Sequence, residues 1–145
     1  MKQLLALTIA LLLTISMTFA ANITNNDEAN VSFRKDFKQA ELLSTDAGKD
    51  YTKFTFKING AVLYAFYNQN GELLAVTHNM KSTELPMNLL MQIKHDHADC
   101  WVTDCFEIDT NGSTSYYITL ENADTKLTLH SNGNEWETYS RIVKI

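Results

Sequence analysis

Residues 51–76 read YTKFTFKINGAVLYAFYNQNGELLAV and contain three short runs of strand-forming residues. The turns between them are Asn59-Gly60 and residues 68–71. Asn-Gly between alternating runs is typical of a type I′ hairpin, because both residue types tolerate a positive φ. The first run alternates apolar and polar side chains, Phe54, Phe56 and Ile58 against Lys53, Thr55 and Lys57. The stretch therefore predicts a three-stranded β-meander.

The second half of the chain repeats this pattern. Turn residues at 111–112, 122–125 and 132–134 separate four further runs of strand character: Trp101–Ile108, Thr114–Glu121, Lys126–Ser131 and Glu135–Val143. Corresponding residues lie 62 positions apart, with Phe54, Phe56, Ile58 and Gly71 matching Tyr116, Ile118, Leu120 and Gly133. We therefore expect two pseudo-repeats, residues 30–80 and residues 81–145.

Each half is expected to open with a short amphipathic helix. Asn30 or Ser32 caps the first helix, whose apolar positions are Val31, Phe33, Phe37 and Ala40. The second begins at the only proline, Pro86, and runs to about His97. Its apolar stripe consists of Leu85, Leu89, Leu90 and Ile93, with Met87 and Met91 beside them. A strand over residues 41–46 and a polar connector over residues 77–83 complete the first half.

These elements predict an α+β fold with a tandem helix-plus-antiparallel-strands repeat. Both helices are expected to pack on one face of a single antiparallel sheet of about eight strands. The other face of the sheet would then stay open.

The N-terminus is typical of an exported protein. Residues 1–20 combine an early lysine, an apolar run and small residues before Ala21, which predicts a signal peptide cleaved after Ala20. Residues 21–29 are polar and are expected to form a flexible tail before a single domain at residues 30–145. No later segment is long and apolar enough to span a bilayer, so we expect a secreted or periplasmic protein without membrane insertion.

Charge argues against nucleic acid as a partner. The full chain has a formal net charge of −5, and removing Lys2 with the signal peptide makes the mature chain more acidic still. Its lysines are scattered, whereas binding to a nucleic-acid backbone needs a basic stripe.

Two cysteines remain, Cys100 and Cys105. If residues 101–108 form one strand, five residues separate the two Cα atoms by roughly 16 Å and place the side chains on opposite faces. We therefore expect two unpaired thiols, at least one of them buried.

The densest group of metal-type side chains is His95-Asp96-His97-Ala98-Asp99-Cys100. His95 and His97 would share a side of an extended segment and could bind zinc or copper, but on a helix they diverge. In the last turn of a helix they would instead interact favourably with its negative end. No second pair of ligands, nucleophile with a base, or phosphate-binding loop is evident, so we expect no cofactor and no enzymatic activity.

Aromatic residues on the predicted strands are the one positive indication of function. Some should project from the open face, where rigid amphipathic rings suit recognition, although rings can equally pack against one another there. The candidate binding residues are Lys53, Tyr67 and Tyr117.

Residues 33–76 resemble the PepSY-like, β-lactamase-inhibitor-protein-like exported domains of Bacteroidetes, and the likeness covers most of the mature chain. It rests on Asp36-Phe37-Lys38-Gln39-Ala40, on the strand with Phe54 and Phe56, and on the aromatic strand closed by Asn70-Gly71. The resemblance implies a tandem α/β unit with helices behind a concave sheet and no catalysis. No inhibitory loop can be matched residue by residue, and Cys100 and Cys105 do not reproduce the inhibitor's two disulfides.

We therefore expect an exported, non-catalytic module that recognises an unknown protein or peptide on the open sheet face, as an inhibitor would. The alternatives are a metal-binding protein or metal-dependent enzyme using His95 and His97, and a structural protein of the cell envelope.

Overall fold

The computed structural model describes residues 27–145, which form two α-helices, a short 3₁₀ helix and eight strands. In chain order these elements are α2 (Asp27–Asp36), β1 (Glu41–Ala47), β2 (Tyr51–Ile58), β3 (Ala61–Asn68), β4 (Leu73–Asn79), η1 (Ser82–Glu84), α3 (Met87–Asp96), β5 (Trp101–Thr110), β6 (Ser113–Glu121), β7 (Thr125–Ser131) and β8 (Glu137–Val143). Each α-helix thus precedes four strands. The predicted α+β class, with two helices and about eight strands, is confirmed.

The strands form one antiparallel sheet in the order β1 to β8, so each strand pairs with its neighbours in the chain. Two-residue turns determine the register of two hairpins. At the β2–β3 turn, Asn59 and Gly60 adopt φ values of 51° and 87°, and Ile58 pairs with Ala61. Asn111 and Gly112 adopt the same conformation between β5 and β6. Both turns have the positive φ values that the Asn-Gly signal predicts.

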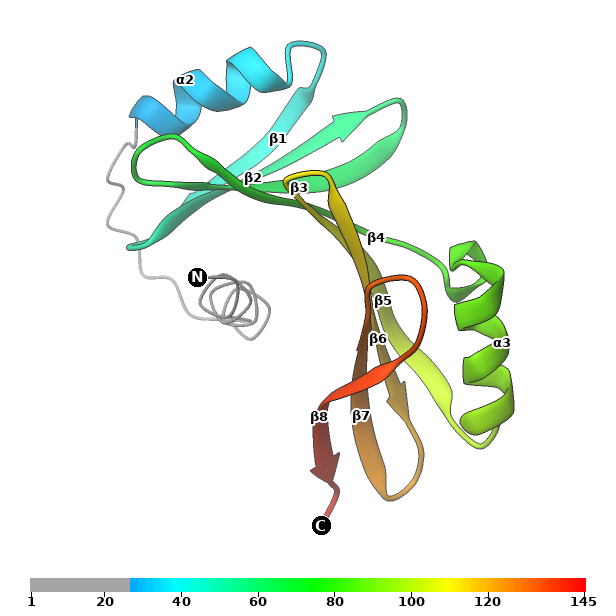
Figure 1. The fold of residues 1–145 in the computed structure, drawn as a ribbon. Helices are drawn as coiled ribbons and strands as arrows, with labels where there is room; N and C mark the ends of the chain where they lie inside the picture. Colours follow the sequence, from blue (N-terminus) through cyan, green and yellow to red (C-terminus); the bar gives the residue numbers. More distant parts are fainter. Residues whose placement is uncertain (1–26) are drawn as a thin grey trace.

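Figure 1 shows a strongly curved sheet with both helices on its outer, convex side. The four strands after α3 descend at a steep angle to the strands near α2. The side without helices is therefore concave. We name this side the concave face. Strand pairing places Lys53, Tyr64, Phe106 and Tyr117 on it.

Each helix closes its own apolar cluster on the convex side. Under α2, Phe33 stacks on Phe54 with 4.5 Å between ring centroids and meets Phe56 edge-on at 5.2 Å. Under α3, Leu85 and Ile93 pack against five side chains of β5, β6 and β7: Cys105, Ile118, Leu120, Leu127 and Leu129. Burial of large apolar side chains is the main stabilising contribution in a domain of this size.

The first helix begins earlier than its sequence pattern suggests. It starts at Asp27, so residues 27–29, expected to end a flexible tail, form its first turn. Ala29 and Phe33 are the buried residues of the helix, Phe37 just after it is partly buried at the same four-residue spacing, and Val31 is 67% exposed. The acidic side chains Asp27 and Glu28 suit the positive end of this helix.

Strand β4 is longer than expected. Residues 77–79, predicted to belong to a polar connector, continue the strand, and Thr77 and Asn79 pair with Ile108 and Phe106 of β5. Their polar side chains are compatible with a strand because β5 supplies the backbone partners. Likewise, Met87 and Met91 of α3 are 70% and 54% exposed, so the buried stripe of that helix is narrower than predicted.

Within residues 27–145, no helix is long and apolar enough to cross a membrane. The predicted signal peptide, residues 1–20, and residues 21–26 of the predicted tail lie outside the described part of the chain.

Candidate functional site

The concave face is the part of the sheet on which recognition residues can be sought, since the helices occupy the other side. Strand pairing identifies the side chains that share it. Phe106 opposes Asn79 and Tyr117, and Tyr117 opposes His130, so this row crosses β4 to β7. In the first half, Lys53 opposes Phe66 and Thr55 opposes Tyr64 on the same side.

One group of rings lies near the β2–β3 hairpin. Tyr51 meets Phe66 edge-on, with 5.6 Å between the ring centroids. The Nζ atom of Lys53 lies 5.7 Å from the centroid of Tyr64 and 3.5 Å from Asp46 Oδ2. This cation–π contact orients the lysine along the concave face while its side chain stays partly exposed.

A second group lies on β5 to β8. Tyr117 stacks on Phe106 at 5.2 Å, contacts Tyr139 edge-on at 5.4 Å and lies 4.6 Å from the ring of His130. Tyr117 is buried by these neighbours, whereas Tyr139 is 39% exposed. Beneath the rings, Ile108 is also buried. These stacked rings therefore form a rigid aromatic patch on the β5–β8 part of the concave face.

Burial determines the charge of this patch. It raises the pKa of Tyr117 to about 12, and the neighbouring Tyr139 adds to the effect. Burial also lowers the pKa of His130, with Glu137 opposing that shift. At neutral pH the centre of the patch is therefore uncharged.

The structure places the three predicted binding residues differently from one another. Lys53 lies on the concave face, as expected. Tyr117 also lies there, but packed beneath other rings. The expectation that Tyr67 projects from the open face is wrong, because this side chain is fully buried under α2 and donates a 2.9 Å hydrogen bond to Asp36 Oδ2.

Tyr64 and Tyr139 take the place of Tyr67 as accessible concave-face rings. A signal for the first was present in the sequence. The Asn59-Gly60 turn pairs Ile58 with Ala61, and counting outward pairs Thr52 with Tyr67 and Thr55 with Tyr64. Since Phe54 and Phe56 form the core side, Tyr67 must share it and Tyr64 must face away. Tyr139 lies where the β7–β8 register shifts, which simple alternation does not reveal.

His95 and His97, the alternative metal-binding residues, lie at the C-terminal end of α3. His95 contacts the adjacent Asp96, and His97 ends α3. Among residues 27–145, no three His, Cys, Asp or Glu side chains are grouped to hold a metal ion. The alternative interpretation of His95 and His97 as a zinc or copper pair therefore gains no third grouped ligand from the described residues.

Both cysteines are free thiols, as predicted. Their expected placement on opposite faces is wrong, because Cys100 precedes β5 and packs against the same apolar cluster as Cys105. Burial raises the pKa of the Cys105 thiol to about 11, with Asp104 and Glu84 adding to it. This is the behaviour of a packed core residue, opposite to that of an activated nucleophile.

A hollow of about 370 Å³ borders the second ring group. It is lined by His130, Ser131, Asn132, Asn134, Glu135 and Glu137, from the end of β7, the loop after it and the start of β8. The sequence predicts this loop only as a turn, and no residue of it as a binding residue, because its acidic and amide side chains resemble those of any polar turn.

Comparison with known proteins gives fold relatives only. No family model and no curated protein matches the chain. A BLIP-like (β-lactamase-inhibitor-protein-like) protein from Bacteroides fragilis matches with a TM-score of 0.70 and 15% identity, over 81% of this chain and 86% of that one. A DUF2874 family protein from Bacteroides ovatus matches with a TM-score of 0.69 and 13% identity, over 86% and 89% of the two chains.

A third similar structure, from Bacteroides eggerthii, is described as a candidate periplasmic protein. Its TM-score is 0.68 and its identity 13%, over 81% of this chain and 87% of the other. None of these three is described as PepSY-like, so that part of the sequence resemblance stays an expectation. At such low identity the likeness concerns the fold alone, which this chain shares with a BLIP-like protein and a DUF2874 family protein from Bacteroides.

Proposed function

We propose that this protein is an exported, non-catalytic module that recognises a protein partner on its concave face. The observation that carries the proposal is the distribution of side chains on the two sides of the sheet. The helices occupy the convex side, and ring groups from both halves of the chain lie on the other (Figure 1). Rings held by stacking lose little conformational freedom on binding, which favours their use in recognition.

The chemistry of the face supports binding over catalysis. Its central rings are uncharged at neutral pH, and Lys53 is engaged by Asp46 and Tyr64. An enzyme needs a nucleophile or base held near an acid or an electrophile. The described residues of the concave face offer rings, hydroxyls, a lysine paired with Asp46 and a partly buried imidazole beside Glu137, and these are not arranged as such a set.

More specifically, we propose that the protein partner is an enzyme and that binding inhibits it. It is supported by the BLIP-like structural relative from Bacteroides fragilis. A concave sheet can receive a convex part of a partner, such as the rim around an enzyme's active site. The partner is thus proposed to be a folded protein.

We also propose that the protein is exported and that its two halves arose by internal duplication. Export to the periplasm or medium is supported by the signal-peptide pattern of residues 1–20 and by the Bacteroides eggerthii relative. A duplication with halves at residues 30–80 and 81–145 is supported by the helix-plus-four-strands order of each half. It would explain why two ring groups lie on one face.

Site-specific photocrosslinking in the producing cell tests the recognition surface. A photoreactive phenylalanine analogue replaces Tyr64 or Tyr139 on the concave face, and Val31 or Met91 on the exposed sides of the helices. The four positions are matched in being apolar or aromatic and partly exposed.

The proposal predicts one discrete crosslinked protein from both concave positions and none from the two helix positions. Crosslinks from Val31 or Met91 alone would place recognition on the helices and contradict it. Crosslinks from neither pair would contradict a stable protein partner.

A further inference from the structure

The hollow beside the second ring group has fixed walls. Asn88 of α3 donates hydrogen bonds to the carbonyl oxygens of Gly133 and Asn134, at 2.8 and 3.1 Å. Gln92 donates a further bond to Asn134 at 2.9 Å. The loop between β7 and β8 is therefore held on the helix before any ligand arrives.

Trp136 secures the other end of the same loop. Its indole Nε1 donates a 3.0 Å hydrogen bond to the Leu89 carbonyl, and its ring packs against the apolar cluster under α3. Because Glu135 and Glu137 flank this anchored tryptophan, the backbone that carries both carboxylates is fixed in position. Preorganised groups of this kind lose less entropy when a ligand binds.

The charge of the hollow is negative. Glu135 and Glu137 are the ionisable acids among its lining residues, and none of the six is Lys or Arg. Neither carboxylate forms an ion pair with a Lys or Arg within residues 27–145. Burial lowers the pKa of His130, so its imidazole is neutral at neutral pH and does not offset the two carboxylates.

Aromatic rings adjoin this acidic hollow. The ring of His130, which lines it, lies 4.6 Å from Tyr117, and Tyr139 follows at 5.4 Å from Tyr117. A volume of about 370 Å³ is an order of magnitude above the ~30 Å³ that one liquid water occupies, so a side chain can enter. Carboxylates beside an aromatic ring favour a cation with a flat or extended stem.

We propose that this hollow receives a basic side chain of the partner, with arginine preferred over lysine. The inference rests on the proposed function and adds the chemistry of one anchor point. The guanidinium donates to Glu135 and Glu137, and its planar face lies against the ring of His130, which lines the hollow. Lysine offers the charge without the planar fork, so it binds more weakly.

Titration of the isotopically labelled chain, purified in the form that cells release, tests this directly. The probes are acetyl-Gly-Arg-Gly-amide and the same peptide with neutral citrulline in place of arginine. Backbone amide shifts of residues 130–137 are followed by NMR up to about 10 mM peptide, since a single side chain gives at best weak affinity.

Two double variants carry the same change of charge. Glu135→Gln/Glu137→Gln alters the hollow, and Glu41→Gln/Asp124→Asn removes two exposed acids elsewhere. We expect saturable shifts at residues 130–137 with the arginine peptide alone. The first variant should bind it at least about threefold more weakly, and the second should bind it as the parent does.

Absence of saturable shifts at residues 130–137, equal response to citrulline, or equal weakening by the two variants would each overturn the inference. NMR spectra of the variants also report whether the sheet remains folded. The titration and the crosslinking experiment can fail independently. Crosslinking from Tyr64 and Tyr139 can succeed while the arginine peptide does not bind, and the peptide can bind while crosslinking fails.

Discussion

Tyr67 shows how one hydroxyl links a helix to the sheet. Its ring is buried beneath α2 and meets Phe54 edge-on at 5.6 Å, while its hydroxyl reaches Asp36 at the end of the helix. Burial and this carboxylate both raise the pKa of Tyr67. The residue therefore stabilises the fold, although tyrosines on strands also suit recognition.

Tyr67→Phe removes only the hydroxyl and should lower the free energy of unfolding by about 1 kcal/mol, because the exposed Asp36 can return to water. Tyr67→Ala should cost about 3–5 kcal/mol through the cavity that it leaves. Urea denaturation measures both. No loss of stability from Tyr67→Ala would show that the ring is not part of the core.

Cys105 makes the stability of the protein sensitive to alkali. Its folded pKa lies near 11 and its unfolded value near 9, so the thiol contributes stability that is complete below pH 9. Between pH 9 and 11 the unfolded chain ionises first, and this contribution falls by about 2 kcal/mol.

Cys105→Ala should therefore show a shallower loss of stability than the parent between pH 9 and 11, in denaturation curves at matched pH. The parent should also label at Cys100 before Cys105 when native, since Cys105 is only 4% exposed. Two thiols should label after denaturation without reductant. Parallel pH profiles, or no label in the denatured chain, would contradict the assignment of a buried free thiol.

The hairpins were the most predictable elements, because their signals are local. The Asn59-Gly60 and Asn111-Gly112 turns need only two residues with positive φ, and alternation beside them identifies the strands. The start of α2 was not predictable from its polar first turn. It depends on Ala29, whose burial is decided by contact with strands distant in the chain.

The β3–β4 turn illustrates a close contact that the sequence does not reveal. Gly71 has a φ of +74°, and a Cβ atom there would lie 2.8 Å from Ser32 Oγ and 2.9 Å from the Glu28 carbonyl oxygen. The turn is thus pressed against α2. Gly60 has a φ of +87°, but a Cβ there would meet nothing within 4 Å.

Gly60→Ala should cost about 1–2 kcal/mol for the left-handed backbone alone. Gly71→Ala should cost at least about 2 kcal/mol more, because the helix backbone must also move. Thermal or urea unfolding of the two variants measures the difference. Equal losses would show that α2 and this turn are not in close contact.

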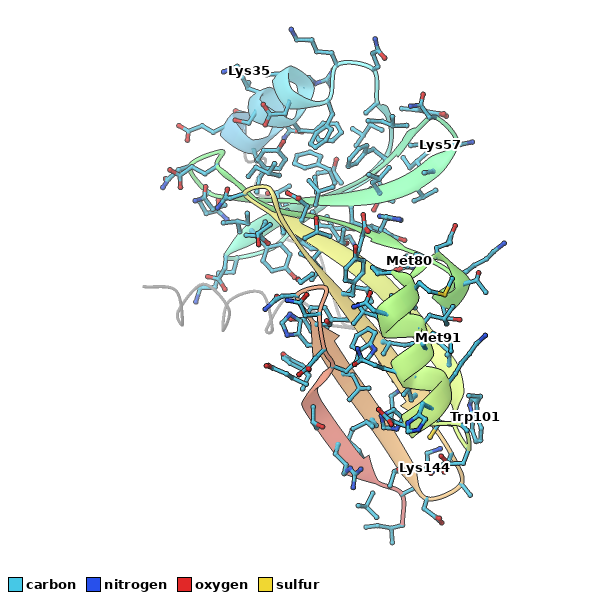
Figure 2. All side chains as sticks on the ribbon, turned by 45° about the vertical axis from the view of Figure 1, so that its right-hand side comes forward. Lys35, Lys57, Met80, Met91, Trp101 and Lys144 are labelled. Carbon is cyan, nitrogen blue, oxygen red and sulfur yellow. The ribbon has the colours of Figure 1, made fainter. Side chains whose placement is uncertain are left out.

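The fold and the recognition surface differ in how far the sequence determines them. Helix and strand order already implied one antiparallel sheet with helices on one side, and the structure confirms that arrangement. Figure 2 shows the side chains along the curved sheet and on its helices, with Lys57 on β2 and Met91 on α3. The curvature itself results from long-range twist and register shifts, which short sequence patterns do not encode.

Short sequence patterns also predict the candidate site only in part. Lys53 could be placed on the correct face by alternation alone. Tyr117 could be placed on that face, but its burial depends on Phe106, His130 and Tyr139 from three other strands. A hollow beside these rings requires the docking of the β7–β8 loop on α3, which joins segments more than 40 residues apart.

Recognition through the concave face is the central claim, and the affinity of the crosslinked partner for matched single variants tests it most directly. Calorimetry or surface-based binding would compare Tyr139→Ala with Met91→Ala, both at partly exposed positions on opposite sides of the molecule. We predict that Tyr139→Ala weakens binding by about 1–3 kcal/mol and that Met91→Ala leaves it unchanged. Unchanged affinity for Tyr139→Ala together with a loss for Met91→Ala would contradict the account.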